Sequence, residues 1–326
     1  MGGDHAPACV VEGALLALRD APGRFSVVLV GRQGAVADEL ARLGGTPAGL
    51  TVVHAPEVIA MDDPPTVALK AKKHSSIAVG LGMVRDASAQ AFVSAGNTGA
   101  VFSASTLILG RLTGVGRPTI GALIPTSRGR TLLIGAGANV DCRAQHLFEF
   151  AVMGSIYMTS LEHRERPTIG LLNIGEEDAK GNEVSQEAFR LLRASSLNFR
   201  GNIEGRDLLS GEVDVAVCDG FVGNIILKFG ESVPAFLKAK VKAFAARNPL
   251  NALVALIAGK GLRSSLKELD YQEHGGVPVL GVRGVSIIGH GGSTPKAIKN
   301  MILRAEEMIL RRVETQIQET LRAHHG

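Results

Sequence analysis

Three stretches of the sequence share one design: a short apolar run ends in small polar residues, and a helical pattern begins directly after them. The fullest example is residues 168–182, where the apolar run is followed by Asn173, two carboxylates and Lys180. Residues 91–100 and 213–224 repeat the design. In a wound α/β protein such loops lie at the carboxyl ends of sheet strands, where ligands bind. One such loop is often only a turn with a helix cap, but three of them favour a ligand-binding α/β fold.

The length and composition fit this fold class. With 326 residues the chain has enough material for one large α/β domain or two smaller ones, and its 40 glycines suit many tight turns. The sequence contains no linker-like or low-complexity tract. We therefore expect a single α/β domain over residues 1–326, with a wound, mostly parallel but mixed sheet, helices on both faces, and a helical protrusion at about residues 231–269.

Composition weakens several other classes of function. The net charge is only +4 and aromatic residues make up 4% of the chain, with no Trp, so we expect no nucleic-acid partner. Cys9, Cys142 and Cys218 are odd in number and widely spaced, which matches neither a disulfide framework nor a zinc site. We expect no metal and no cofactor, a reducing cytoplasm, and neither a secretory leader nor a membrane-spanning run.

Two apolar runs in the middle of the chain constrain the topology. Residues 118–125 and 130–135 are joined by only four residues, a connection that allows an antiparallel hairpin and no parallel crossover. The sheet should therefore be mixed.

Two long helical patterns carry clusters of lysine. We predict one helix over residues 66–89, whose lysines at positions 70–73 form a solvated face. A second pattern runs from Ile225 to about Leu269, with breaks expected at Pro234 and near residue 249. Its apolar end has a basic rim, which suits either a membrane interface or burial against a partner subunit.

Five loops at predicted strand ends are rich in Gly, Asn, Asp and Ser. If they converge, as strand ends in one parallel sheet tend to do, they line one pocket rich in backbone amides, which suits phosphate. The sequence lacks the P-loop lysine pattern, the nucleophile elbow, the HExxH motif and a complete dinucleotide-binding fingerprint. The five loops are residues 2–5, 94–99, 173–182, 219–224 and 290–294.

Seven motifs, in order along nearly the whole chain, carry a resemblance to a known family. The chain resembles the PlsX family of bacterial phosphate acyltransferases. The motifs are Met1-Gly-Gly-Asp-His-Ala-Pro7, Ser94-Ala-Gly-Asn-Thr-Gly-Ala100, Gly135-Ala-Gly-Ala-Asn-Val-Asp141, Gly170-Leu-Leu-Asn-Ile-Gly-Glu-Glu177, Lys180-Gly-Asn182, Asp219-Gly-Phe-Val-Gly-Asn224 and Gly275-Gly-Val-Pro-Val-Leu-Gly281.

The resemblance implies that inorganic phosphate attacks the thioester of acyl-[acyl carrier protein], giving acyl phosphate and free carrier for phospholipid synthesis. A downstream glycerol-3-phosphate acyltransferase would use the acyl phosphate. The resemblance also implies a fold similar to the isocitrate and isopropylmalate dehydrogenases, a homodimer, and loose attachment to the inner membrane face. The residues expected to contact the carrier or the membrane are Lys238, Lys240, Lys242, Leu253, Ile257, Arg263 and Lys267.

The sequence departs from the family pattern in two places. The family usually has a short strand ending in Asp before the turn at residues 1–5, so the resemblance implies that a strand central to the sheet is missing here. We expect this difference to affect stability and activity. Residues 290–296 read His-Gly-Gly-Ser-Thr-Pro-Lys, where the family more often has His-Gly-Ser-Ser-Asp-Ala-Lys. That change preserves the chemistry of a turn and a helix cap.

The candidate site residues all come from these loops. We expect phosphate ligands in residues 94–99, asparagines that orient the thioester carbonyl, histidines that donate to phosphate or thiolate unless they are structural, and carboxylates that orient other groups. The expected phosphate ligands are Gly96, Asn97, Thr98 and Gly99, with Lys180 as the charge partner. The expected catalytic asparagines and histidines are Asn173, Asn182, Asn224, His5 and His290. The supporting carboxylates are Asp4, Glu176 and Asp219.

Three alternatives remain open at this point. A phosphotransacylase that uses coenzyme A differs only in the thiol carrier. A dehydrogenase of the related fold would need a metal-binding aspartate cluster and an adenine site, which the sequence does not show. A non-enzymatic scaffold at the membrane would need only the basic apolar segment and would leave the polar loops without a role.

Overall fold

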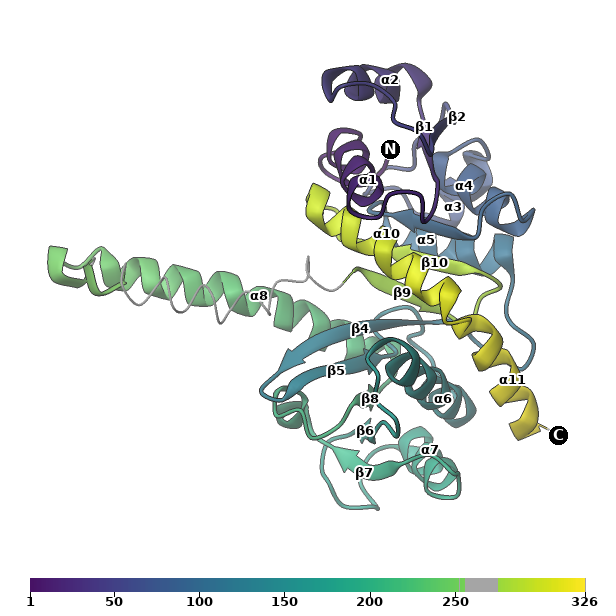
Figure 1. Cartoon of the computed structure of the whole chain (residues 1–326). Helices are drawn as coiled ribbons and strands as arrows, with labels where there is room; N and C mark the ends of the chain where they lie inside the picture. Colours follow the sequence, from purple (N-terminus) through teal and green to yellow (C-terminus); the bar gives the residue numbers. More distant parts are fainter. Residues whose placement is uncertain (252, 256–274, 326) are drawn as a thin grey trace.

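The computed structural model describes residues 1–251, 253–255 and 275–325. The strands are β1 (Val27–Gly31), β2 (Leu50–His54), β3 (Ala91–Ser94), β4 (Thr119–Thr126), β5 (Gly129–Ile134), β6 (Ile169–Leu172), β7 (Phe199–Ile203), β8 (Val215–Val217), β9 (Val277–Leu280) and β10 (Val285–Ile288). Eight of them form a mixed sheet in the order β3-β10-β9-β4-β5-β8-β6-β7, and β1 and β2 form a separate parallel pair (Figure 1). The predicted α/β class with a mixed sheet is confirmed.

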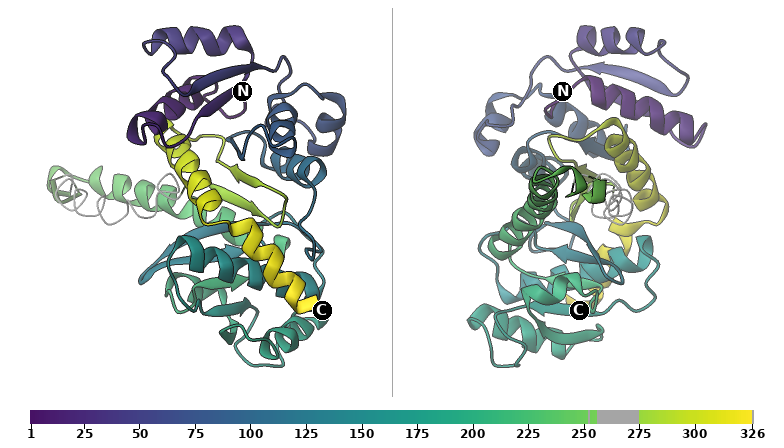
Figure 2. Two further views of the ribbon diagram at one scale, coloured as in Figure 1. Left: turned by 45° about the vertical axis from the view of Figure 1, so that its right-hand side comes forward. Right: turned by 90° about the vertical axis from the view of Figure 1, so that its left-hand side faces the viewer.

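Helices cover both faces of the large sheet (Figure 2). They are α1 (Ala8–Asp20), α2 (Gln33–Arg42), α3 (Pro65–Ala71), α4 (Ser76–Arg85), α5 (Thr98–Ala104), η1 (Ser105–Leu109), α6 (Ala144–Leu161), α7 (Glu183–Arg193), η2 (Gly205–Leu209), α8 (Gly220–Ala245), α10 (Pro295–Leu310) and α11 (Val313–His325). Side chains alternate between two cores, as strands require: Leu132 and Ile134 face one core and Leu133 the other. The first core packs under α6, α7, α10 and α11, and the second under α3, α4, α5, η1 and the start of α8.

The predicted hairpin sets the directions of the strands. β4 and β5 pair antiparallel from Gly121 with Ile134 to Thr126 with Gly129. β4 also pairs antiparallel with β9, and β9 with β10. As a result β3, β10 and β4 run in one direction, whereas β9, β5, β8, β6 and β7 run in the other.

The single helix expected over residues 66–89 is two helices. α3 ends before Lys72, and α4 starts again after Ser75, whose hydroxyl accepts a hydrogen bond from the amide of Ala78. Lys72 is not a solvated lysine. Its ammonium donates to the carbonyl of Val58 at 2.9 Å and to the carboxylate of Asp63. This long-range contact turns the chain at the break.

The break expected at Pro234 is also wrong, because α8 runs through it. Pro234 has no N–H to donate to the carbonyl of Gly230, four positions earlier, but Gly230 is exposed, so water can satisfy that carbonyl. α8 extends away from the sheet (Figure 1). The predicted contact residues Ile257, Arg263 and Lys267 lie outside the described residues.

A cavity of about 470 Å³ lies between β1 and β3. Among the described strands, β1 pairs only with β2 and β3 only with β10, so each has an unpaired edge. Met1 lies at the end of β1, since a Cβ added at Gly31 would come within 2.6 Å of its Cγ. Burial lowers the pKa of its amino group. A strand placed in this cavity would lie between the unpaired edges of β1 and β3.

We expect an added strand ahead of Met1 to stabilise the protein. Five apolar residues span about 16 Å, the length of β1, and would pair with both free edges. A gain of about 1–2 kcal/mol would raise the melting temperature of a chain of this length by about 1.5–3 °C. Thermal unfolding of this variant should be compared with that of a Gly/Ser extension of equal length, and equal melting temperatures would contradict the prediction.

Candidate active site

The polar loops form two groups, not the single convergent pocket expected from a parallel sheet. The carboxyl ends of β3 and β10 point one way, and those of β5, β8 and β6 point the other way, because the β4–β5 hairpin reverses the strand direction. However, α5 follows the first set of strand ends and α8 follows the second, and both helices pack on the same face of the sheet. The two groups therefore flank one face.

The first loop group consists of residues 2–5, 60–63, 94–99 and 290–294. The amide of Asp4 donates to the carbonyl of Gly291 at 2.8 Å. A Cβ at Gly2 would lie 2.5 Å from Cα of Gly96, so the two turns pack backbone against backbone and tolerate no side chain at Gly2. Three of the five predicted loops thus meet here.

Asn97 holds the first loop group together. Its Nδ2 donates to the carbonyls of Ala60, Met61 and Asp63 at 3.2, 3.0 and 3.0 Å. Its Oδ1 accepts from the amide of Ala100 at 3.0 Å and so caps α5. With these four contacts the Asn97 side chain is fully engaged, which leaves the Thr98 hydroxyl and the first amides of α5 as the donors this loop offers a phosphate.

The residues at 60–63 were missed by sequence reasoning. Asp63 accepts from Lys72 and from the amide of Ala60 at 2.8 Å. The hydrogen bond from Lys72 lowers the pKa of Asp63, with the backbone bond as the second cause. No local sequence pattern connects residues 60–63 with the loop at 94–99, so this contact could not be predicted from the sequence.

The two candidate histidines are exposed at the edge of the first loop group. Nδ1 of His290 accepts from the amide of Gly292 at 3.0 Å, which fixes the orientation of the imidazole in this turn. His5 begins the turn into α1, and its carbonyl accepts from the amide of Cys9 at 3.1 Å. Both imidazoles remain proposed donors.

The second loop group begins with residues 135–141 and 219–224. Gly135 has φ +103° and no room for a side chain, since a Cβ would lie 1.8 Å from the carbonyl oxygen of Cys218. The amide of Gly220 donates to the carbonyl of Asn139 at 2.7 Å, which ties the two loops together. Asp219 accepts from the amide of Val222 at 2.8 Å and caps α8, so its carboxylate orients backbone amides.

Asn224 is the asparagine of this group with a free amide. Its side chain lies against Gly137, where a Cβ would come within 3.2 Å of its Oδ1. In contrast to Asn97, it is only partly buried and makes no side-chain hydrogen bond within the ranges that the structure describes. It therefore has donor capacity left for a ligand.

The loop at 173–182 follows β6 and completes the second group. Nδ2 of Asn173 donates to the carbonyl of Lys180 at 3.0 Å and to Oδ1 of Asn202 at 3.1 Å. Asn182 caps α7 by accepting from the amide of Ser185 at 2.9 Å. These asparagines shape the loop and offer little to a substrate.

The charges of this loop are exposed. Lys180 lies 3.8 Å from Glu177, a long ion pair that leaves its ammonium available to an anion. Glu176 pairs with Arg206 at 3.2 Å, so this carboxylate orients an arginine from η2 that sequence reasoning did not select.

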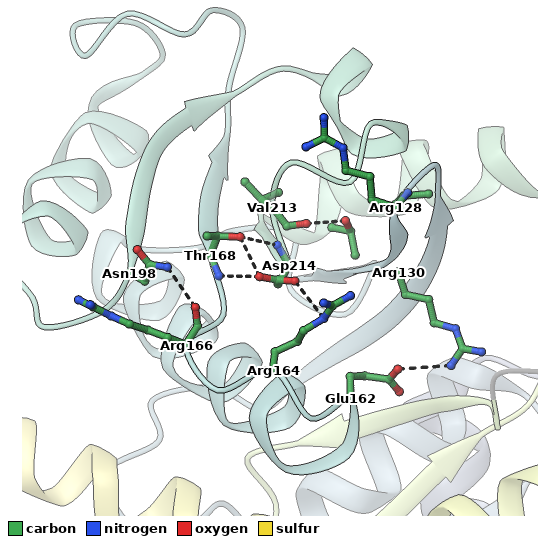
Figure 3. A network of polar contacts seen from close by, with 11 residues as sticks. Arg128, Arg130, Glu162, Arg164, Arg166, Thr168, Asn198, Val213 and Asp214 are labelled. Carbon is green, nitrogen blue, oxygen red and sulfur yellow. Dashed lines mark hydrogen bonds and ion pairs between the residues drawn. The ribbon is translucent and has the colours of Figure 1, made fainter.

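Asp214 holds the strands beneath the second loop group (Figure 3). Its Oδ2 accepts from the amide and the hydroxyl of Thr168, both at 2.8 Å, and Arg164 lies 3.4 Å from its Oδ1. Asp214 precedes β8 and Thr168 precedes β6, so this contact helps to fix the register of the two parallel strands. The register in turn sets where the loops after these strands lie.

The cysteines near the second group are poor nucleophiles. Burial, followed by the negative charge of Asp219, raises the pKa of Cys142 to about 11. Burial also raises the pKa of Cys218. Both remain thiols at neutral pH, so neither supplies the thiolate that covalent catalysis requires. In the described ranges no group of three His, Cys, Asp or Glu residues is placed to hold a metal ion.

Comparison with known proteins agrees with this architecture. The family model described as "Fatty acid synthesis protein" matches residues 1–316. A phosphate acyltransferase from Chlorobaculum parvum is 46% identical over 330 residues, which cover 98% of this chain and 97% of the relative. The chain belongs to the phosphate acyltransferase family. The recognition made from the seven motifs is confirmed.

Solved structures share the fold at low identity. A phosphotransacetylase from Streptococcus pyogenes has a TM-score of 0.63 at 15% identity, with 94% of this chain and 92% of that chain covered. A putative 4-hydroxythreonine-4-phosphate dehydrogenase from Salmonella typhimurium has a TM-score of 0.51 at 13% identity, with coverage of 91% and 95%. At these identities the likeness is one of fold alone.

We expect Asn97→Ala to lower the free energy of unfolding by about 2–4 kcal/mol. The change removes a helix cap, which contributes about 1 kcal/mol, and leaves three carbonyls without their donor. The matched control is Asn224→Ala, which should change stability by less than about 0.5 kcal/mol. Urea denaturation measures both, and equal effects would contradict the structural role of Asn97.

Proposed function

We propose that this protein transfers a fatty acyl group from acyl-[acyl carrier protein] to inorganic phosphate. A phosphate oxygen attacks the thioester carbon, the carbon–sulfur bond breaks, and the products are acyl phosphate and the free carrier thiol. The observation that carries the proposal is the match to phosphate acyltransferases over 98% of the chain. The polar loops flanking one face of the sheet supply the donors that such a reaction needs.

The chemistry requires little acid–base catalysis. Inorganic phosphate has a second pKa near neutrality, so a substantial fraction is dianionic and attacks without a strong general base. The leaving thiolate corresponds to a thiol of pKa about 8.5 and needs little protonation. The protein must position the two substrates, stabilise the thioester oxyanion and exclude competing water.

The two loop groups divide these tasks. Thr98 and the amides of residues 98 and 99, at the start of α5, are the proposed phosphate ligands, and His290 is a further proposed donor. Asn224 is the proposed donor to the thioester oxygen, because it lies in the first turns of α8 and its amide has no hydrogen-bond partner among the described residues. Lys180 supplies positive charge to the same face. Asn97, Asn173 and Asn182 support these groups through the backbone contacts that they make.

α8 is the proposed surface for a second subunit and for the membrane. Its apolar side chains Phe229 and Phe236 are 71% and 60% exposed, a cost that burial against a second copy would remove. Leu253, which follows the turn after α8, is 53% exposed and is proposed to touch lipid together with Lys240 and Lys242 of α8. Within the described ranges, no helix combines the length and the apolar character that a bilayer-spanning segment needs. We propose peripheral attachment from the cytoplasm through these exposed apolar side chains. The acyl phosphate would pass to a glycerol-3-phosphate acyltransferase.

We expect release of free carrier thiol from palmitoyl-[acyl carrier protein] to depend on added phosphate. A thiol reagent measures the release, and free coenzyme A and free carrier are tested as competing products. Release that does not respond to phosphate would refute the transferase and favour a scaffold role. Inhibition by coenzyme A and none by carrier would favour a coenzyme A-dependent phosphotransacylase.

We expect Asn224→Ala to lower kcat by about 10²-fold, because an oxyanion donor stabilises the transition state more than the bound substrate. The KM for phosphate should change little. Thr98→Ala should show the opposite pattern, with a raised KM for phosphate. Full activity in Asn224→Ala would remove this residue from the site.

A further inference from the structure

Four arginines gather beside the second loop group and form what we call the arginine patch. Arg111 donates to the carbonyl of Gly116, and its own carbonyl accepts from Nε of Arg283 at 3.0 Å. Arg117 donates to the carbonyl of Asp141 at 2.8 Å. The patch consists of Arg111, Arg117, Arg143 and Arg283, all of them exposed.

The patch has little compensating negative charge. In the part of the chain that the structure describes, no carboxylate lies within ion-pair distance of its four guanidinium groups. Glu149 is beneath the patch and only 2% exposed, and it accepts from the amide of Gly116 at 2.7 Å. Asp141 contributes its carbonyl to Arg117 and carries the one exposed carboxylate of the adjoining loop.

Three arginines of the patch lie near one histidine, His146, in the first turn of α6. Nδ1 of His146 accepts from the amide of Arg143 at 3.1 Å, and a Cβ at Gly116 would lie 3.0 Å from its ring. Burial lowers the pKa of His146, and the charges of Arg117, Arg143 and Arg111 lower it further. The 18-residue helix α6 adds the positive end of its dipole to the same place.

The patch is continuous with the proposed site of thioester cleavage. Nδ2 of Asn139 donates to the carbonyl of Pro118, next to Arg117, at 2.6 Å. The carbonyl of Asn139 accepts from the amide of Gly220, at the start of the helix that carries Asn224. One short loop therefore links the arginines to that asparagine.

We propose that the arginine patch docks an acidic face of the protein that carries the acyl thioester. This inference rests on the proposed function and adds the surface on which the donor binds. Exposed arginines without ion pairs attract carboxylates and steer association. Val140, 57% exposed between Arg117 and Arg143 in the chain, adds an apolar contact of the kind found inside a polar interface rim. The segments at 110–117 and 139–146 contain no aromatic residue for stacking on nucleic-acid bases.

This placement differs from the expectation that lysines of α8 receive the carrier. Lys240 lies over the ring of Phe236 at 5.3 Å, within the exposed apolar surface of α8. That surface suits a second subunit or lipid, whereas the arginine patch lacks the long apolar stripe. The two surfaces therefore have separate proposed partners.

The test is the double variant Arg117→Glu/Arg143→Glu in the full chain. Fluorescence anisotropy measures binding of labelled holo-carrier, and thiol release measures KM for palmitoyl-carrier. We expect both the dissociation constant and KM to rise about tenfold or more at low salt, with a weaker salt dependence than in the unmodified protein. Release from a palmitoyl-pantetheine thioester, which has no acidic protein body, should stay within about twofold.

The matched control is Arg128→Glu/Arg166→Glu, which changes two exposed arginines away from the patch. Equal weakening of carrier binding in both double variants would overturn the proposal, as would unchanged binding in the patch variant. An equal loss of activity with palmitoyl-carrier and with palmitoyl-pantetheine would mean that the arginines act in the reaction itself, and it would overturn the docking proposal. If the glutamate variant unfolds, Arg117→Gln/Arg143→Gln takes its place in the same binding and thiol-release measurements. Failure of phosphate-dependent release in the unmodified protein would refute the proposed function, while carrier anisotropy would still test the patch.

Discussion

The antiparallel pairing of β4 with β5 is the constraint on which the rest of the structure depends. It runs from Gly121 with Ile134 to Thr126 with Gly129 and reverses the strand direction in the middle of the sheet. A fully parallel sheet would place every loop along one edge. Here the loops leave in two directions, and α5 and α8 then return to the same face. The candidate site residues are therefore divided between two loop groups.

The sequence predicted the features that depend on neighbouring residues. A four-residue link between two apolar runs leaves only a hairpin, so β4 and β5 were found correctly. The strand-loop-helix units were found because apolar runs and small polar residues alternate locally. Contacts between distant segments could not be predicted in this way. Lys72 hydrogen-bonds to Val58 and Asp63, and Asn97 hydrogen-bonds to residues 60–63. No local sequence pattern predicts such tertiary contacts.

Residue type alone did not separate structural from functional candidates. Asn97 and Asn224 both lie where a strand leads into a helix, yet Asn97 is buried and makes four hydrogen bonds, whereas Asn224 is half-buried and has no side-chain hydrogen bond to the described residues. A buried amide that already has all its partners cannot turn to a substrate without leaving carbonyls unpaired. The number of hydrogen bonds that each asparagine can still make, which only the folded structure reveals, therefore separates the structural candidates from the functional ones.

The same reasoning applies to charge. Most exposed arginines in the second half of the sheet have carboxylate partners, as Arg193 has Asp178 and Arg200 has Glu212. Exposed ion pairs contribute little to stability, so leaving Arg117 and Arg143 without carboxylates costs the fold little. The positive electrostatic potential of these two arginines can therefore attract a partner, because no carboxylate of the described chain neutralises it. Arg128 and Arg166 are also exposed and have no carboxylate partner among the described residues, so it is the gathering of several such arginines that distinguishes the surface next to Asn139.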